Sequence, residues 1–188
     1  MKITSAEFVT GLKGEAPILY EHKPQYAFIG RSNVGKSSLI NCLLDRKSLV
    51  KTSSTAGKTK EINFFLVNYK MYFVDLPGYG FSHSTIEEEA AFSQLIQWYF
   101  MEPVFKRKAV LIVDARIKPS DFDLEMYRIL KENEVETIVV ANKVDSLIQK
   151  EKHANLKALA EAFPGVSIIP CSAKTRLGRD EIWKKLLE

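Results

Sequence analysis

The sequence predicts an α/β domain with a six-stranded, mostly parallel sheet, one antiparallel edge strand and helices on both faces. Short β-branched runs alternate along the chain with longer amphipathic segments. The runs are apolar over their whole length, which is typical of parallel strands buried on both faces. The tight connection Asn68-Tyr69 joins two of the runs as an antiparallel hairpin.

The elements follow from these patterns in chain order. The expected strands are 26–29, 62–67, 71–74, 109–113, 137–141 and 166–169. The expected helices are 36–44, 86–101, 121–133, 149–163 and 179–187. Residues 1–22 have weak periodicity, so we expect an N-terminal extension, such as a strand plus loop, packed on a domain that spans 23–188.

Length and composition agree with one such domain. The chain has 188 residues, against about 150 for a typical domain. Hydrophobic residues make up 46% and charged residues 27%, enough to bury a core. Cys42 and Cys171 exclude a multi-bridge disulfide framework, and no apolar run approaches the roughly 20 residues that span a bilayer. We therefore expect a cytoplasmic protein without membrane contact.

A phosphate-binding loop stands between the first of these expected strands and the first helix. Its residues are Gly30-Arg31-Ser32-Asn33-Val34-Gly35-Lys36-Ser37, which match the pattern G-x-x-x-x-G-K-[ST]. The two glycines let backbone N–H groups point at a phosphate, and the helix that follows adds its positive end. Lys36 is expected to reach the β- and γ-phosphates, and the Ser37 hydroxyl to bind Mg²⁺.

A second motif selects the base. Asn142-Lys143-Val144-Asp145 follows the strand 137–141. The Asp145 carboxylate can accept from both N1–H and the 2-amino group of guanine, whereas adenine offers neither donor. Asn142 is expected to tie this loop to the phosphate loop, and the Lys143 stem to cover the ring. A third base-contacting loop would be Cys171-Ser172-Ala173, with Cys171 a packed thiol rather than a nucleophile.

Two further segments resemble the switches of a nucleotide-dependent protein. The turn Asp75-Leu76-Pro77-Gly78 places an aspartate that can hold Mg²⁺ through a water, and a backbone N–H at Gly78 for the γ-phosphate. The segment 45–60 is too long and polar for a simple connection, so it is expected to be switch I. Its Thr55 and Thr59 are the candidates for a second hydroxyl on Mg²⁺.

The sequence does not decide which residues act in hydrolysis of the bound nucleotide. Tyr79 stands where many GTPases place a water-orienting glutamine, and a phenol cannot easily do that work. We therefore expect slow intrinsic hydrolysis, stimulated by a partner or a cation. The Asn33 side-chain oxygen could help to hold K⁺ against the phosphates, or could simply stabilise the loop. His83 is interpreted as switch II surface.

The chain resembles the EngB/YsxC/YihA family of bacterial ribosome-associated GTP-binding proteins over nearly its whole length. The matching segments are 30–41, 57–59 with 62–65, 75–80, and 114–116 with Asp121 and Asp123. The resemblance implies a Ras-like P-loop GTPase fold and makes Thr59 the Mg²⁺ ligand. It also implies nucleotide contacts from Gly57, Lys58, Thr59, Lys60 and Glu61. Ala56 and Lys60 depart from the family's usual proline and glutamine.

The resemblance further implies a function. GTP would be hydrolysed to GDP and phosphate in a switch for large ribosomal subunit assembly, needed for normal cell division and septation. The GTP form of a monomer would bind ribosomal RNA and ribosomal proteins. One alternative is a GTP-dependent scaffold with negligible turnover, and another is an ATP-using P-loop kinase, which Asp145 opposes.

The net charge of +4 is concentrated in one segment. Between residues 46 and 70 the only acid is Glu61, against the cations Arg46, Lys47, Lys51, Lys58, Lys60 and Lys70. Such a run is either a solvated face or a contact to RNA phosphate that the switch would control.

Overall fold

A computed structural model of the chain describes residues 1–51, 61–80 and 85–188. Several predicted functional residues lie outside these ranges. They are the switch I residues Thr55, Gly57, Lys58, Thr59 and Lys60, together with His83. In the described part of the chain, no helix is long and apolar enough to cross a membrane.

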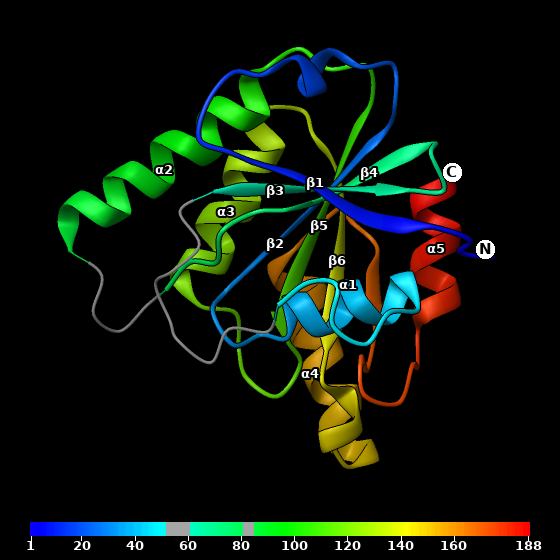
Figure 1. Ribbon diagram of the computed structural model, residues 1–188. Coiled ribbons are helices and arrows are strands. Elements are labelled where there is room, and N and C mark those ends of the chain that lie inside the picture. Colours follow the sequence, from blue (N-terminus) through cyan, green and yellow to red (C-terminus); the bar gives the residue numbers. More distant parts are fainter. Residues whose placement is uncertain (52–60, 81–84) are drawn as a thin grey trace.

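The strands form a single mostly parallel sheet, as expected, in the order β1-β3-β4-β2-β5-β6-β7 (Figure 1). Their bounds are Ala6–Leu12 (β1), Gln25–Gly30 (β2), Ile62–Val67 (β3), Met71–Asp75 (β4), Arg107–Asp114 (β5), Glu136–Asn142 (β6) and Ile168–Pro170 (β7). The neighbouring strands β4, β2, β5, β6 and β7 pair in parallel, in that spatial order. Strand β3 is antiparallel to both of its neighbours, β1 and β4. The carboxyl ends of the parallel strands therefore share one edge, where such sheets bind ligands.

Among the described residues the sheet has seven strands, so the expected count of six was wrong. The additional strand is β1, which takes the edge and leaves the antiparallel strand β3 one position inside it. A strand was expected within the extension 1–22, but not its bounds or its pairing in the sheet, because its large apolar residues Phe8 and Val9 are exposed rather than buried. Hydrogen bonds to Asn68 fix the segment that leads into β1. Asn68 accepts from the Thr4 N–H at 2.8 Å and donates to the Lys2 carbonyl at 3.0 Å.

The Asn68-Tyr69 connection is the expected hairpin turn between β3 and β4. Both residues have left-handed backbone angles, with φ of 50° at Asn68 and 57° at Tyr69. Turns with two such residues match the twist of paired antiparallel strands. The turn therefore fixes the register in which Val67 faces Met71.

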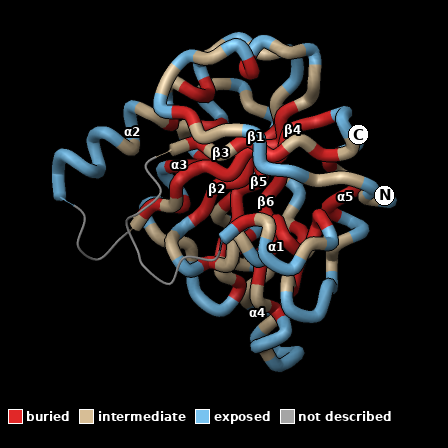
Figure 2. Tube along the Cα trace, viewed as in Figure 1, coloured by how far each residue is buried: buried red, intermediate tan, exposed pale blue. Residues whose placement is uncertain are grey.

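In the described ranges, five α-helices cover the two faces of the sheet, as the alternating pattern predicts. Their bounds are Lys36–Leu44 (α1), Ile86–Met101 (α2), Asp121–Glu132 (α3), Gln149–Ala162 (α4) and Arg179–Leu187 (α5). One apolar cluster joins the sheet to α2, α3 and α4, and a second joins it to α1 and α5. Figure 2 shows the buried strands between these layers, with the first turns of α2 exposed. Two layers of helices thus leave the edge loops as the accessible part of the sheet.

Candidate functional site

One side chain joins three of the loops that the sequence predicts to bind nucleotide. The Asn142 amide at the end of β6 donates to the Val34 carbonyl at 3.0 Å, and its oxygen accepts from the Ala173 N–H at 3.2 Å. A fourth loop is attached through backbone, because the Ser32 N–H donates to the Tyr79 carbonyl at 2.9 Å. The structure therefore brings the phosphate loop, the two base loops and the segment after β4 to one place.

The phosphate loop needs glycine at two points for steric reasons. Gly35 has a φ of 96°, and a Cβ there would lie 2.5 Å from the Asn142 amide nitrogen. A Cβ on Gly30 would lie 2.6 Å from the Ile112 carbonyl oxygen. Helix α1 begins directly after Gly35, and no capping side chain among the described residues bonds to its first turn. Its N–H groups are thus left to the loop, the arrangement by which helix N-termini bind anions.

Lys36 and Asp75 form an ion pair within the site. The Lys36 ammonium donates to Asp75 Oδ1, and the two side chains are only 12% and 8% exposed. The pair unites the residue predicted to bind phosphate with the residue predicted to hold Mg²⁺ through a water. Each charge therefore depends on the other for compensation in a largely buried setting.

The donor chemistry of this site fits Mg²⁺. Hard oxygen ligands from one carboxylate and one or two hydroxyls, completed by phosphate oxygens and waters, are typical of this ion. Asp75 and Ser37 supply such oxygens at the end of β4 and in the first turn of α1. The described residues contain no group of three His, Cys, Asp or Glu side chains that could hold a metal alone. A metal here would therefore depend on the nucleotide's own oxygens.

The Lys143 side chain links the base loop to the phosphate loop. Lys143 has a φ of 70°, and its ammonium donates to the Asn33 carbonyl at 2.6 Å and to Asp114 Oδ2 at 2.9 Å. Asn33 is exposed and has a φ of 64°, a backbone conformation that asparagine tolerates. Both interpretations of Asn33, as a K⁺ ligand and as a loop stabiliser, remain predictions.

Asp114 is a member of the site that the motif analysis did not select. Both of its oxygens accept from Arg116, at 2.9 and 2.8 Å, and one also accepts from Lys143. Partial burial raises the pKa of Asp114, but the hydrogen bonds from Arg116 and Lys143 outweigh it and lower the pKa to about 2. An acid at the carboxyl end of a buried strand was the available signal. Asp114 therefore fixes the Lys143 side chain in place.

The remaining base-loop residues lie where the strand ends predicted. Asp145 is exposed in a short 3-10 turn, Val144–Ser146, whose first N–H donates to the Cys171 carbonyl at 3.1 Å. The Ser172 hydroxyl accepts from the Thr175 N–H at 3.0 Å and shapes the third loop. Cys171 is only 1% exposed, and burial raises its pKa to about 12. The thiol therefore packs and stays protonated.

The Tyr79 side chain is buried against α3. It is 4% exposed, and its hydroxyl donates to Asp123 Oδ1 at 2.6 Å. Burial, together with the Asp123 carboxylate, raises the pKa of Tyr79 well above its usual value. Asp123 also accepts from Ser120 at the start of α3. The Tyr79 hydroxyl is thus engaged with α3.

Three more predicted residues occupy the same edge or its flank. Leu76 is fully buried, and its N–H donates to the Phe28 carbonyl at 3.0 Å. Pro77 follows it, and Gly78 lies against the phosphate loop, where a Cβ would be 3.2 Å from Ser32 Oγ. Glu61 instead pairs with Lys13 at 3.2 Å, on the side of β1. Its predicted nucleotide contact stays a prediction.

Comparisons with known proteins agree with this geometry. Residues 25–143 match the family described as 50S ribosome-binding GTPase. A probable GTP-binding protein EngB of Bacillus mycoides is 41% identical, over 99% of this chain and 96% of its own. A probable GTP-binding protein EngB of Bacillus cereus has the same identity and coverage.

Solved structures give the same result. The crystal structure of a probable GTP-binding protein EngB superposes with a TM-score of 0.71 at 27% identity, covering 87% of this chain and 96% of that one. A variant of Era from Aquifex aeolicus, bound to GDP·AlF4⁻, also has a TM-score of 0.71, at 26% identity and with 88% and 56% covered. The full-length identity to curated relatives, the family match and the fold together show that the chain belongs to the EngB family of GTP-binding proteins.

Proposed function

We propose that the protein is a GTP-dependent switch in large ribosomal subunit assembly, hydrolysing GTP to GDP and phosphate in the cytoplasm. The observation that best supports it is the Asn142 amide, which joins the phosphate loop to the base loop and the 171–173 loop. A nucleotide laid across these loops would contact all of them. Normal cell division and septation would depend on this role through the ribosome.

The chain's own residues would divide the work as follows. The N–H groups of 30–37 and the Lys36 ammonium bind the phosphates, and Asp145 reads guanine. Ser37 and Thr59 hydroxyls, with Asp75 through a water, would hold Mg²⁺, which when bound neutralises phosphate charge. The N–H of Gly78 would bond the γ-phosphate, so its loss on hydrolysis releases the switch.

The switch is tested by sedimentation with ribosomal subunits under GDP and under a non-hydrolysable GTP analogue. We expect the protein to accompany large subunits only with the analogue. Equal binding in both states would contradict the switch. Competition of ATP and GTP against labelled GDP tests the base assignment independently, because a kinase of the same loop class would bind ATP tightly.

A second candidate is a GTP-dependent scaffold with negligible turnover. The engagement of the Tyr79 hydroxyl with Asp123 favours it, because this leaves the segment after Gly78 without its phenol to act on water. Single-turnover hydrolysis, with and without large subunits and in K⁺ against Na⁺, separates the two. Stimulation by subunits supports the switch, and stimulation by K⁺ over Na⁺ supports a bound K⁺, for which Asn33 is the candidate ligand. Negligible hydrolysis in all four conditions supports the scaffold.

A further inference from the structure

A pocket of about 330 Å³ lies beside the phosphate loop, on the side of α3. One wall is the loop segment 31–34, and the other is the connection between β5 and α3. Gly80 and Lys143 complete it, whereas Lys36, Ser37 and Asp145 are not among its lining residues. The pocket thus adjoins the proposed nucleotide site and shares the segment 31–34 and Lys143 with it.

The pocket carries an excess of positive charge. Its lining includes the cations Arg31, Arg116, Lys118 and Lys143 and only two acids, Asp114 and Asp123. Both acids are engaged: Asp114 accepts from Arg116 and Lys143, and Asp123 accepts from Tyr79 and Ser120. The net charge of the lining is therefore +2, four cations less two acids.

Two of these cations are available to a ligand. Arg31 and Lys118 are exposed, and within the ranges that the structure describes neither forms an ion pair. The Arg31 side chain lies along Gly80, where a Cβ would be 3.2 Å from Arg31 Cγ and Nε. The Arg31 guanidinium group therefore belongs to the pocket lining beside Gly80, where its geometry suits an oxyanion.

The walls add a donor and an apolar surface. Ser32 is one of the lining residues, and its buried Oγ, on the side of Gly78, has no hydrogen-bond partner in the described part of the chain. Buried hydroxyls normally have a partner, so this one is suited to bond a ligand oxygen. Ile117, which is 49% exposed, Val113 and Pro119 provide apolar contact next to the cations.

We propose that this pocket binds a nucleotide unit of single-stranded RNA, with its phosphodiester on Arg31 and Lys118 and its ribose and base on Ile117 and Pro119. Guanidinium groups match phosphate geometry, and the volume suits one small ligand but not a duplex. An acidic protein segment would use the same cations but would leave the apolar wall and much of the volume unused. The inference rests on the proposed function for the source of the RNA.

The shared wall would couple the pocket to the nucleotide. Ser32 and Asn33 belong to the phosphate loop, and Tyr79 and Gly80 continue the segment that carries the γ-phosphate contact. A ligand that prefers one arrangement of this wall changes GTP affinity, and GTP changes RNA affinity by the same factor. RNA bound in the pocket would then change the affinity of the nucleotide site for GTP.

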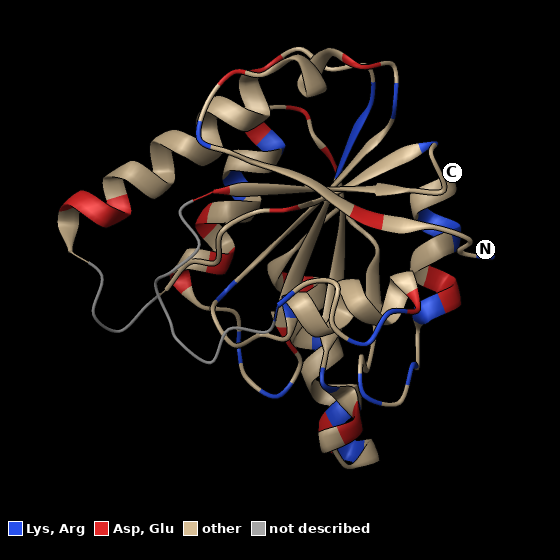
Figure 3. Ribbon diagram, in the orientation of Figure 1, with Lys and Arg blue, Asp and Glu red and all other residues tan. Residues whose placement is uncertain are grey.

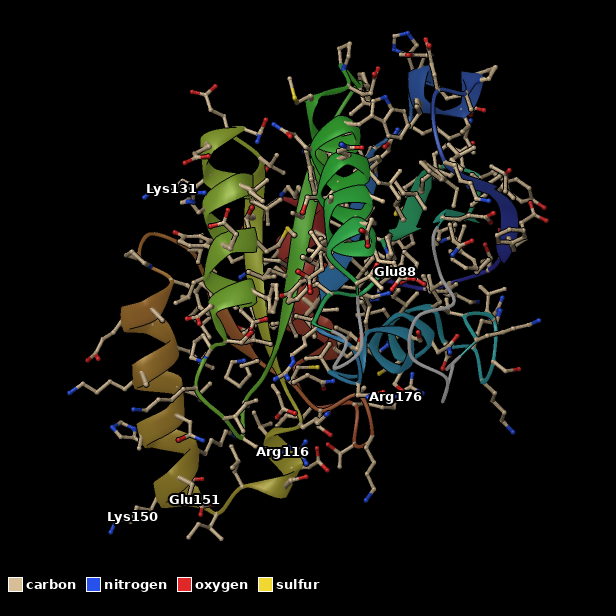
Figure 4. The ribbon with its side chains drawn as sticks, turned by 90° about the vertical axis from the view of Figure 1, so that its left-hand side faces the viewer. Glu88, Arg116, Lys131, Lys150, Glu151 and Arg176 are labelled. Carbon is tan, nitrogen blue, oxygen red and sulfur yellow. The ribbon has the colours of Figure 1, made fainter. Side chains whose placement is uncertain are left out.

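Helix α3 offers a matched pair of lysines for the test. Lys118 precedes the helix at the pocket, and Lys131 is exposed in its last turn. Figure 4 shows Lys131 at the end of α3 opposite to Arg116, and Figure 3 shows Lys and Arg on several of the loops in the lower half of the view. Lys118→Glu and Lys131→Glu change the charge equally, but only the first changes the pocket.

The experiment measures fluorescence anisotropy of a labelled oligouridylate of about ten nucleotides with the full chain, with and without GDP. We expect Lys118→Glu to weaken RNA binding roughly tenfold and to flatten its salt dependence, and Lys131→Glu to change it less than about twofold. Lys118→Gln, which removes the charge without reversing it, should weaken binding by an intermediate factor. Labelled GDP should bind all three variants as it binds the original chain.

Three results would overturn the pocket. They are no RNA binding by the original chain, equal loss in Lys118→Glu and Lys131→Glu, and equally tight binding of an oligoglutamate with the same dependence on Lys118. The last would assign the site to an acidic protein. Failure to bind GDP would count against the proposed function instead, since RNA binding is measured without nucleotide as well.

Discussion

The Tyr79 hydroxyl donates a 2.6 Å hydrogen bond to Asp123 Oδ1 and so fastens the segment after β4 to the first turn of α3. The bond is buried and joins residues 44 positions apart in the sequence. Asp123 also accepts from the Ser120 N–H at 2.8 Å as part of a capping box. One carboxylate therefore serves both the start of α3 and the segment after Gly78.

Removal of this bond should lower stability more than it lowers nucleotide binding. Tyr79→Phe leaves the buried Asp123 carboxylate with one partner fewer, which should reduce the free energy of unfolding by about 2 kcal/mol. Urea denaturation measures the change. The matched control is Tyr69→Phe, at a tyrosine 70% exposed in the hairpin turn, which should change stability by less than about 0.5 kcal/mol. Equal effects of the two changes would mean that the Asp123 bond contributes nothing.

Variants of the Lys36–Asp75 pair should have different effects on stability but the same effect on GDP binding. Lys36→Met leaves the Asp75 carboxylate buried and unpaired, and should cost about 3 kcal/mol of stability. The double variant Lys36→Met with Asp75→Leu removes both charges, so its free energy of unfolding should return to within about 1 kcal/mol of the original. Neither variant should bind GDP. A double variant as unstable as the single one would show that the two charges are not coupled.

Asp145 should decide between guanine and xanthine. In Asp145→Asn the side chain can donate to the 2-oxygen of xanthine but no longer accepts from the 2-amino group of guanine. The preference for GDP over XDP should therefore fall by at least about a hundredfold, as measured by competition with labelled nucleotide. Asp180→Asn, on an exposed acid in the first turn of α5, serves as the control with the same charge change. An unaltered preference in Asp145→Asn would remove the base assignment.

Asp114 should contribute to stability at acid pH. Its pKa in the folded protein is about 2, below the value of about 3.9 for an unfolded aspartate. The unfolded state therefore binds the proton first, so this contribution is complete above about pH 5 and is lost as the pH falls toward 2. Asp114→Asn should flatten the dependence of the unfolding midpoint on pH in that window. Parallel curves for Asp114→Asn and the original chain would contradict the depressed pKa.

Local sequence patterns predicted most of the fold because the period and end signals of each element are local. The helices α1, α2 and α5 begin and end where the pattern placed them, and α3 and α4 end one residue earlier than expected. A strand was expected within residues 1–22, but the bounds of β1 and its place in the sheet were not predicted, because Phe8 and Val9 are exposed and give the pattern little contrast. Its place depends on pairing with β3.

The site was predictable where its chemistry is written in contiguous motifs. The hydrogen bonds between motifs were less predictable. The bond from Asn142 to Val34 was expected from the motif's role. The bonds from Tyr79 to Asp123 and from Lys143 to Asp114 were not expected. Each of these two contacts joins residues at least 29 positions apart, and no period or turn signal reports on such a pair. Only the folded sheet brings these residues together.

The two borders of the sheet bear on how the protein behaves at high concentration. On one side, β1 has an irregular register between Phe8 and Thr10, and on the other, β7 has only three residues and ends at Pro170. Bulged and short edges, and a proline without an N–H, give a second chain few groups with which to extend a ladder. The sheet thereby carries its own protection against edge-to-edge aggregation while its loops stay open for ligands.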